Sequence, residues 1–131
     1  LGERAMSTAG VDRERTCPLL LRTFLNKGGH RRQDAYAVRG KEPVEDEVQI
    51  YTWMDATLRE LSDLIKEASP AARERNSQLS FAIVYPDKRG TMTLKEVGIT
   101  HSLRRGGDDE KTLASLHFQT GDYMDCAVLS F

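Results

Sequence analysis

Between residues 47 and 68 the spacing of apolar residues changes from every second position to every third or fourth. Val48 and Ile50 alternate with the polar Gln49, which predicts a half-buried strand. Apolar residues then follow at helical spacing, at Leu58, Leu61, Leu64, Ile65 and Ala68. A helix with one apolar stripe needs other elements to cover it, and the rest of the chain predicts only strands.

The start of this helix carries its own signal. Thr57 and Glu60 have the spacing of a capping box, in which a hydroxyl and a carboxylate accept bonds from free amides of the first turn. Thr52 with Asp55 offers a second cap one turn earlier. The sequence therefore predicts a helix that begins near residue 57, directly after a strand.

Four more segments have the composition of strands, at residues 17–25, 79–85, 92–97 and 123–129. The turn formers of residues 86–90 predict a hairpin between the second and third of them. About twenty residues, 26–46, separate the first two strands of the chain, which is long for a hairpin. We expect residues 1–14 to form a flexible segment outside the fold and residues 15–131 to form one domain.

Composition and charge narrow the function classes. The 19 Lys and Arg residues nearly balance the 20 Asp and Glu residues, so no global field would attract nucleic acid or an anionic membrane. No apolar run approaches the 18 residues of a membrane span, and we expect a soluble, intracellular protein without membrane contact. Cys17 and Cys126 lack metal-site spacing, and we interpret both as small core residues.

The predicted order, two strands, a helix and three strands, resembles the ubiquitin-like β-grasp. The pattern of paired leucines, polar turn and apolar strand in residues 111–129 is similar to the end of ubiquitin. We therefore expect an α+β fold in which a mixed five-stranded sheet packs on one main helix, with a long loop between the first two strands. The first and last strands should run parallel at the sheet centre, since they are the most apolar.

Five blocks read together give a closer resemblance: residues 12–22, 49–58, 81–84, 95–98 and 121–125. They resemble the family of the eighteen-kilodalton polypeptide associated with the Sin-three histone deacetylase corepressor. The chain differs from the family pattern at Ala35-Tyr36, where an acidic residue and Phe are usual.

The resemblance implies a non-catalytic adaptor of the nucleus, with the cytoplasm as a second location. It implies two sets of partners. One is the Sin-three corepressor. The other is an Acinus- or Pinin-type protein with an RNA-recognition-motif splicing factor, which would associate the adaptor with RNA only indirectly.

The sequence itself gives little sign of catalysis. The three histidines lie in no metal-ligand motif, no phosphate-binding or hydrolase signature is present, and we expect no cofactor. Cys126 with His117 could be imagined as a nucleophile and its base. Strand alternation instead directs Cys126 towards the helix, where a thiol is inert.

The same alternation yields a candidate binding surface. It turns one set of residues towards the helix: Leu19, Leu21, Val48, Ile50, Phe81, Ile83, Met92, Leu94, Met124, Cys126 and Val128. The opposite face is then unusually apolar, which indicates either a partner site or a cover made by the long loop, pinned by Tyr36 and Val38. A register shift of one residue would exchange the two faces. Our candidate partner-binding residues are Leu20, Phe24, Tyr51, Trp53, Val84, Tyr123 and Leu129.

Two alternatives remain open. Trp53 lies where the strand meets the helix, so its indole either closes the end of the core or forms an exposed binding hot spot. Two basic clusters, residues 30–32 and 104–105, would allow an RNA-contacting subunit. No aromatic residues for base stacking accompany them, which weakens the RNA hypothesis.

Overall fold

The computed structural model describes residues 11–38 and 40–130. Most of the segment expected outside the fold, residues 1–10, lies outside this description. The strands are β1 (Leu19–Lys27), β2 (Glu47–Thr52), β3 (Ser77–Pro86), β4 (Met92–His101) and β5 (Tyr123–Ser130). The helix is α2 (Leu58–Ala68), and three short 3-10 turns are η1 (Gln33–Tyr36), η2 (Val44–Asp46) and η3 (Pro70–Arg73).

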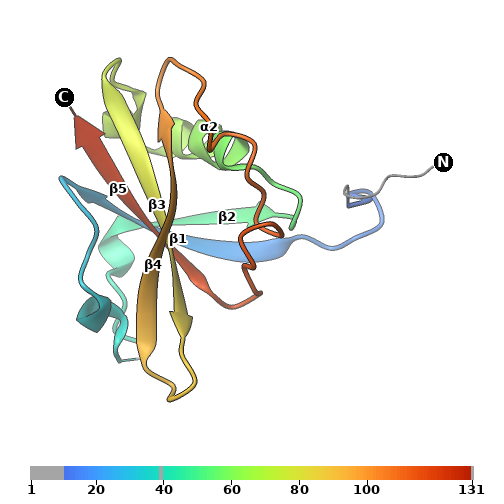
Figure 1. The fold of residues 1–131 in the computed structure, drawn as a ribbon, viewed down its shortest axis with the longest axis vertical. Helices are drawn as coiled ribbons and strands as arrows, with labels where there is room; N and C mark the ends of the chain where they lie inside the picture. Colours follow the sequence, from blue (N-terminus) through green and yellow to red (C-terminus); the bar gives the residue numbers. More distant parts are fainter. Residues whose placement is uncertain (1–10, 39, 131) are drawn as a thin grey trace.

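The five strands form one mixed sheet in the order β2-β1-β5-β3-β4 (Figure 1). β1 and β5 are parallel neighbours at the centre, and all other pairs are antiparallel. This topology with one main helix is the predicted ubiquitin-like β-grasp, so the fold class is confirmed. Among the described residues, no helix is long and apolar enough to cross a membrane.

The helix begins where the capping box predicts. The Thr57 side chain accepts a hydrogen bond of 3.1 Å from the Glu60 amide, so the alternative cap at Thr52 is not used. Leu58, Leu61 and Ile65 are buried on one side of α2, against the sheet. The main core therefore lies between α2 and the face of the sheet formed by Leu21, Ile50, Phe81, Ile83, Met124, Cys126 and Val128.

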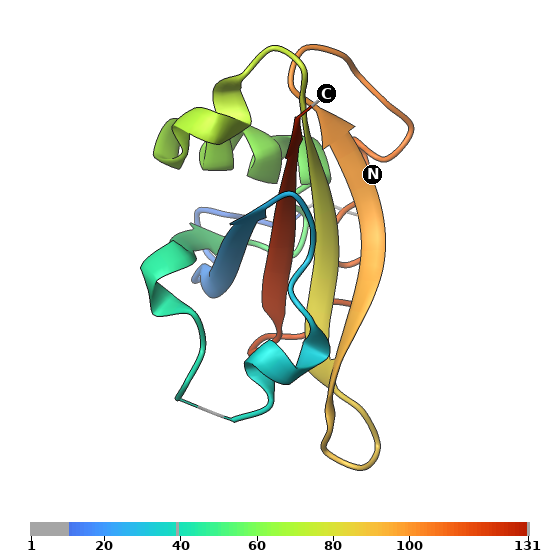
Figure 2. The same cartoon turned by 90° about the vertical axis from the view of Figure 1, so that its left-hand side faces the viewer.

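The other face of the sheet has a second, smaller core. It consists of Phe24, Tyr36, Val84 and Tyr123, with Ala35, Met92 and Leu94 packed around it. Tyr36 belongs to η1, and the loop that carries η1 lies on the far side of the sheet from α2 (Figures 1 and 2). The sequence offered two explanations for this apolar face, a partner site or a cover made by the long loop. In the structure the loop covers it.

Three sequence predictions need correction. Met92 and Leu94 belong to the outer core rather than to the helix face, because Leu94 pairs with Val84 and shares its side of the sheet. Val38 is largely exposed, so Tyr36 anchors the loop without it. Cys17 is exposed, because it precedes β1 instead of lying within the strand, whereas Cys126 is buried as predicted.

Candidate protein-interaction surface

The most exposed aromatic side chain of the sheet lies at one end of its outer face. Tyr51 on β2 is 65 % exposed and stands opposite Leu20 of β1, which is half buried. Trp53 follows two residues after Tyr51 and is also half buried. We call Leu20, Tyr51 and Trp53 the Tyr51 surface.

The segment before β1 supports this surface. The Trp53 indole donates a hydrogen bond of 2.7 Å to the Thr16 carbonyl, and the Arg13 guanidinium lies 4.9 Å from the centre of the indole ring. The Trp53 ring is thus partly enclosed and partly accessible, and it belongs to neither of the two cores, so its role as a binding residue stays a prediction.

Arg13 also ties this segment to the entrance of α2. Its guanidinium donates to Asp55 and to Glu60 at 2.8 to 3.0 Å. Burial acts to raise the pKa of Asp55, but hydrogen bonds from Arg13 and from the Val11 amide outweigh it and lower that pKa. Val11 and Arg13, which fall in the segment expected to be flexible, therefore contact residues around the start of α2.

Three of the candidate residues are closed off by the loop. Phe24 and Val84 have no exposed surface, and Tyr123 is buried beside them. The rings of Phe24, Tyr36 and Tyr123 have centroids 5.5 to 6.1 Å apart with tilted or edge-on geometry, which is favourable for aromatic packing. In the described conformation these three candidates contribute to stability and cannot touch a partner.

A buried carboxylate holds the loop in place. Asp125 on β5 has no exposed surface; its carboxylate accepts a hydrogen bond from the Tyr36 hydroxyl and lies 2.7 Å from His30 Nδ1. The other ring nitrogen of His30 lies 2.9 Å from Ser80 Oγ. Burial, together with the neighbouring Asp125 carboxylate, raises the pKa of Tyr36 far above its usual range. We call His30, Tyr36 and Asp125 the loop latch.

A second set of contacts joins the loop to β1 and β2. The Arg22 guanidinium pairs with Glu47 at 2.6 Å and with Glu42 at 3.1 Å, and it stacks over Phe24 and Tyr123. The hydrogen bonds from Arg22 lower the pKa of Glu47. The end of the loop is thereby fixed beside the aromatic cluster.

The seven candidate residues do not form one surface. Leu129 is half buried and pairs with Gln78, at the opposite end of β5 from the strand's start beside Arg22. Leu20, Tyr51 and Trp53 lie at the end of the sheet where β1 begins and β2 ends. Phe24, Val84 and Tyr123 lie beneath the loop. The accessible part of the candidate site is thus the Tyr51 surface.

The structure also bears on the alternatives. Two residues of the first basic cluster are used internally: His30 belongs to the loop latch, and Arg31 pairs with Asp46 at 2.5 Å. Arg32 remains exposed beside Asp34. In the second cluster Arg104 uses its carbonyl to accept from Arg59, and Arg105 lies 3.6 Å from Glu110.

The Cys126 thiol is unsuited to nucleophilic chemistry, because burial raises its pKa far above the usual range and only the thiolate is reactive. No group of three His, Cys, Asp or Glu residues within the described ranges is arranged to hold a metal ion.

Comparisons with known proteins identify relatives along most of the chain. The family model of the Sin3 associated polypeptide p18 (SAP18) matches residues 10–128. The histone deacetylase complex subunit SAP18 of Arabidopsis thaliana is 60 % identical over 120 residues, which cover 90 % of this chain and 78 % of that protein. The Homo sapiens protein of the same name is 53 % identical over 90 % of this chain and 77 % of its own length.

A solved structure, the C-terminal ubiquitin-like domain of mouse tubulin-specific chaperone e, is similar with a TM-score of 0.46 and 11 % identity. That similarity covers 92 % of this chain and 93 % of the other. Both SAP18 relatives are named as subunits of histone deacetylase complexes, and the family match spans the residues of both cores and of the loop latch. The chain belongs to the Sin3 associated polypeptide p18 family.

Proposed function

We propose that this protein is a non-catalytic adaptor subunit of a Sin3-type histone deacetylase complex and acts in the nucleus. The relatives that share most of its length are subunits of such complexes. The observation that supports a binding role most directly is the exposure of Tyr51 beside Leu20, on a face of the sheet where the aromatic side chains of Phe24 and Tyr123 are covered.

The Tyr51 surface has the properties of an interaction anchor. Binding energy usually concentrates in a few aromatic side chains at the centre of an interface. Tyr51 and Trp53 supply such side chains, and the contacts of Arg13 and Thr16 hold the Trp53 indole in one orientation. A surface that is already ordered loses little entropy on binding.

We propose further that the protein joins splicing-associated assemblies through an Acinus- or Pinin-type partner together with an RNA-recognition-motif factor. The support is the resemblance of the Gln49 to Leu58 block, which contains Tyr51 and Trp53. In this proposal the association with RNA is indirect.

Direct RNA contact is the weaker alternative. Its first basic cluster would have to bind phosphates with Arg32 alone, because His30 and Arg31 are engaged with buried or neighbouring carboxylates. A phosphate-dependent interaction would weaken steeply with salt, whereas an apolar protein contact would not.

The test is a capture experiment with the full chain and two single variants. Tyr51→Glu places a charge in the proposed interface, and Leu103→Glu is the matched control because Leu103 is 67 % exposed and lies in the loop after β4. We expect Tyr51→Glu to reduce the amount of recovered Sin3-type protein, and the deacetylase activity of the captured complex, by at least about tenfold. The introduced carboxylate would lose its water in the interface without gaining a partner.

Leu103→Glu should recover the same amounts as the original chain. Normal recovery with Tyr51→Glu would place the corepressor contact elsewhere on the molecule. The same preparations, probed for an Acinus- or Pinin-type protein, test the splicing proposal separately. If that partner is absent from the original chain's capture, the splicing role is rejected while the corepressor role stands.

A further inference from the structure

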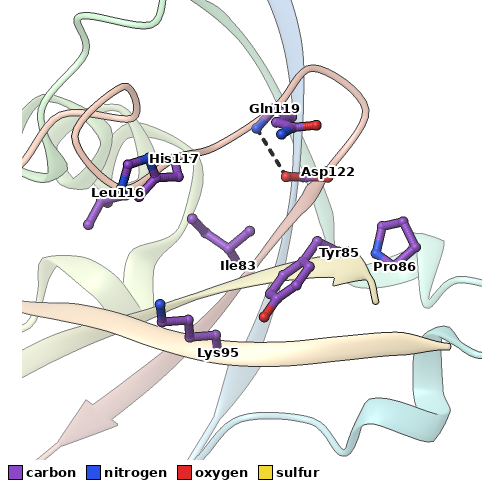
Figure 3. A pocket seen from close by; sticks show the side chains of 8 residues that line it. All are labelled: Ile83, Tyr85, Pro86, Lys95, Leu116, His117, Gln119 and Asp122. Carbon is purple, nitrogen blue, oxygen red and sulfur yellow. Dashed lines mark hydrogen bonds between the residues drawn. The ribbon is translucent and has the colours of Figure 1, made fainter. Parts of the chain in front are cut away.

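A pocket of about 340 Å³ lies on the helix side of the sheet, away from the Tyr51 surface. Ile83 and Leu116 supply apolar surface, and Tyr85 forms a wall. Figure 3 shows Ile83 in the middle of this pocket, Lys95 and His117 towards one end, and Asp122 towards the other. Its volume lies at the lower end of the range of small-molecule sites in proteins, which is enough room for one bulky side chain.

The wall of the pocket is built by a fixed loop. His117 has a positive φ of 61°, which is uncommon for a residue other than glycine. Hydrogen bonds on both sides hold it there, from the His117 amide to the Ala114 carbonyl and from the Phe118 amide to the Leu113 carbonyl, at 3.1 and 3.0 Å. Backbone strain that is held by its surroundings is found preferentially at binding sites.

The acidic side chains near the pocket already accept hydrogen bonds within the protein, whereas the basic ones do not donate any in the described ranges. Asp122 accepts a hydrogen bond from the Gln119 amide, and burial raises its pKa. Asp87, in the adjoining turn, accepts from the amides of Arg89 and Thr91. Both carboxylates therefore serve the backbone of their own turns.

The cations are free. The ammonium of Lys95, which lines the pocket, has no hydrogen bond or ion pair among the residues that the structure describes. The side chains of Lys88 and Arg89, in the turn that follows Pro86, are exposed and equally without a partner in the described ranges. The mouth of a pocket with mixed apolar and polar lining thus carries positive charge that no residue in the described ranges pairs with.

We propose that this pocket binds a short acidic peptide segment of a partner protein, with one bulky apolar side chain on Ile83 and Leu116 and a neighbouring carboxylate paired with Lys95. The apolar lining favours the buried side chain. The unpaired ammonium favours an acidic neighbour over a basic one, and His117 adds a ring nitrogen for hydrogen bonding. The site is independent of the Tyr51 surface, since the two lie on opposite faces of the sheet.

The probes are three fluorescent peptides of equal length. The first has a leucine flanked by aspartates, the second has the same leucine flanked by lysines, and the third has alanine in place of leucine between aspartates. Titration with the full chain, followed by fluorescence anisotropy, should show saturable binding of the first peptide only. Equal binding of the alanine peptide would show a merely charged surface and overturn the proposal.

Two charge reversals complete the test. Lys95→Glu should weaken binding of the aspartate peptide by about tenfold and make the lysine peptide bind, because an exposed lysine can be replaced without loss of packing. Lys41→Glu, in the loop on the other face, is the matched control and should change neither affinity. An unchanged affinity in Lys95→Glu would exclude the site.

Tyr51→Glu should bind the aspartate peptide normally. Failure of the pocket proposal and failure of the proposed corepressor contact are thereby distinguished, because each has its own variant and its own ligand. Thermal melting of every variant shows that a lost affinity is not a lost fold.

Discussion

At the scale of single residues, the buried Asp125 of the loop latch fixes the position of the loop between β1 and β2. Asp125 has no contact with solvent and is satisfied by Tyr36 and His30, both from the loop between β1 and β2. A buried carboxylate without such partners would be strongly destabilising. The fold therefore depends on the loop as much as the loop depends on the sheet.

Removing one hydroxyl should reveal this dependence. Tyr36→Phe leaves one oxygen of Asp125 without a donor and should lower the free energy of unfolding by about 1 to 3 kcal/mol in urea denaturation. Tyr51→Phe, which removes an exposed hydroxyl, is the control and should change it by less than about 0.5 kcal/mol. Equal stability of both variants would contradict the role of the latch.

The same tyrosine predicts a dependence on pH. Because its pKa is raised in the folded state, Tyr36 stabilises the fold below its unfolded pKa of about 10, and this stabilisation is lost as the pH rises above that value. The stability difference between the original chain and Tyr36→Phe should therefore stay constant up to about pH 9 and narrow as the pH rises above about 10. A constant difference would show that Tyr36 ionises equally in both states.

Gly98 is a residue whose importance only the packing shows. A Cβ atom there would lie 2.7 Å from Leu58 Cδ1 and 3.1 Å from the Asp108 Cβ, so β4 can approach the start of α2 only without a side chain. Gly98→Ala should cost about 1 to 3 kcal/mol by overpacking. Gly107→Ala is the control, since nothing lies within 4 Å of its Cβ position, and it should melt within a few degrees of the original chain.

At the scale of elements, α2 was the part most readily predicted from the sequence. Its apolar spacing and its cap are local properties, and the structure has the helix from Leu58 to Ala68 with Thr57 as the cap. The central parallel pair was predictable too, because β1 and β5 are apolar on both faces and the fold resemblance supplied their direction.

The sequence did not determine which side of the sheet Met92 and Leu94 of β4 face, or whether the loop between β1 and β2 packs on the sheet. Alternation shows that Met92 and Leu94 share a face but not which one, and at an edge strand neither face is known to be covered. The latch joins residues about ninety positions apart, and His30 in sequence is indistinguishable from a solvated basic residue. Long-range polar contacts of this kind leave no periodic signal, so the sequence predicts Phe24, Val84 and Tyr123 to be accessible although the loop covers them.

The helix face gives a direct stability prediction. Leu61→Ala removes a side chain with no exposed surface from the main core and should cost about 2 to 5 kcal/mol in urea denaturation. Asp63→Ala, two residues further along α2 and exposed, should change stability by less than about 0.5 kcal/mol. A small effect at Leu61 would mean that another side of α2 faces the sheet.

The segment before β1 can be tested through Trp53. Arg13→Ala removes the cation over the indole and the pairs with Asp55 and Glu60, so the segment should detach and Trp53 emission should shift to longer wavelength. Arg15→Ala is the control, because Arg15 is exposed and pairs with Asp12 of its own segment. Unchanged emission in Arg13→Ala would show that Thr16 alone holds the indole.

At the scale of the whole molecule, both faces of the sheet are covered, one by α2 and the other by the latched loop. A partner therefore binds a domain in which both cores are already covered, and Tyr51 and Trp53 lie accessible at the end of β2. The central claim of this account is that the partner binds the Tyr51 surface without displacing the loop.

Amide hydrogen exchange of the chain, alone and with a Sin3-type partner bound, tests this claim most directly. The account predicts that residues 33–36 exchange slowly already in the free chain, because η1 is anchored by a buried side chain, and that binding adds protection at residues 47–53 only. Faster exchange of residues 33–36 in the complex, with new protection at Phe24 and Tyr123, would show that the partner replaces the loop and would contradict the claim.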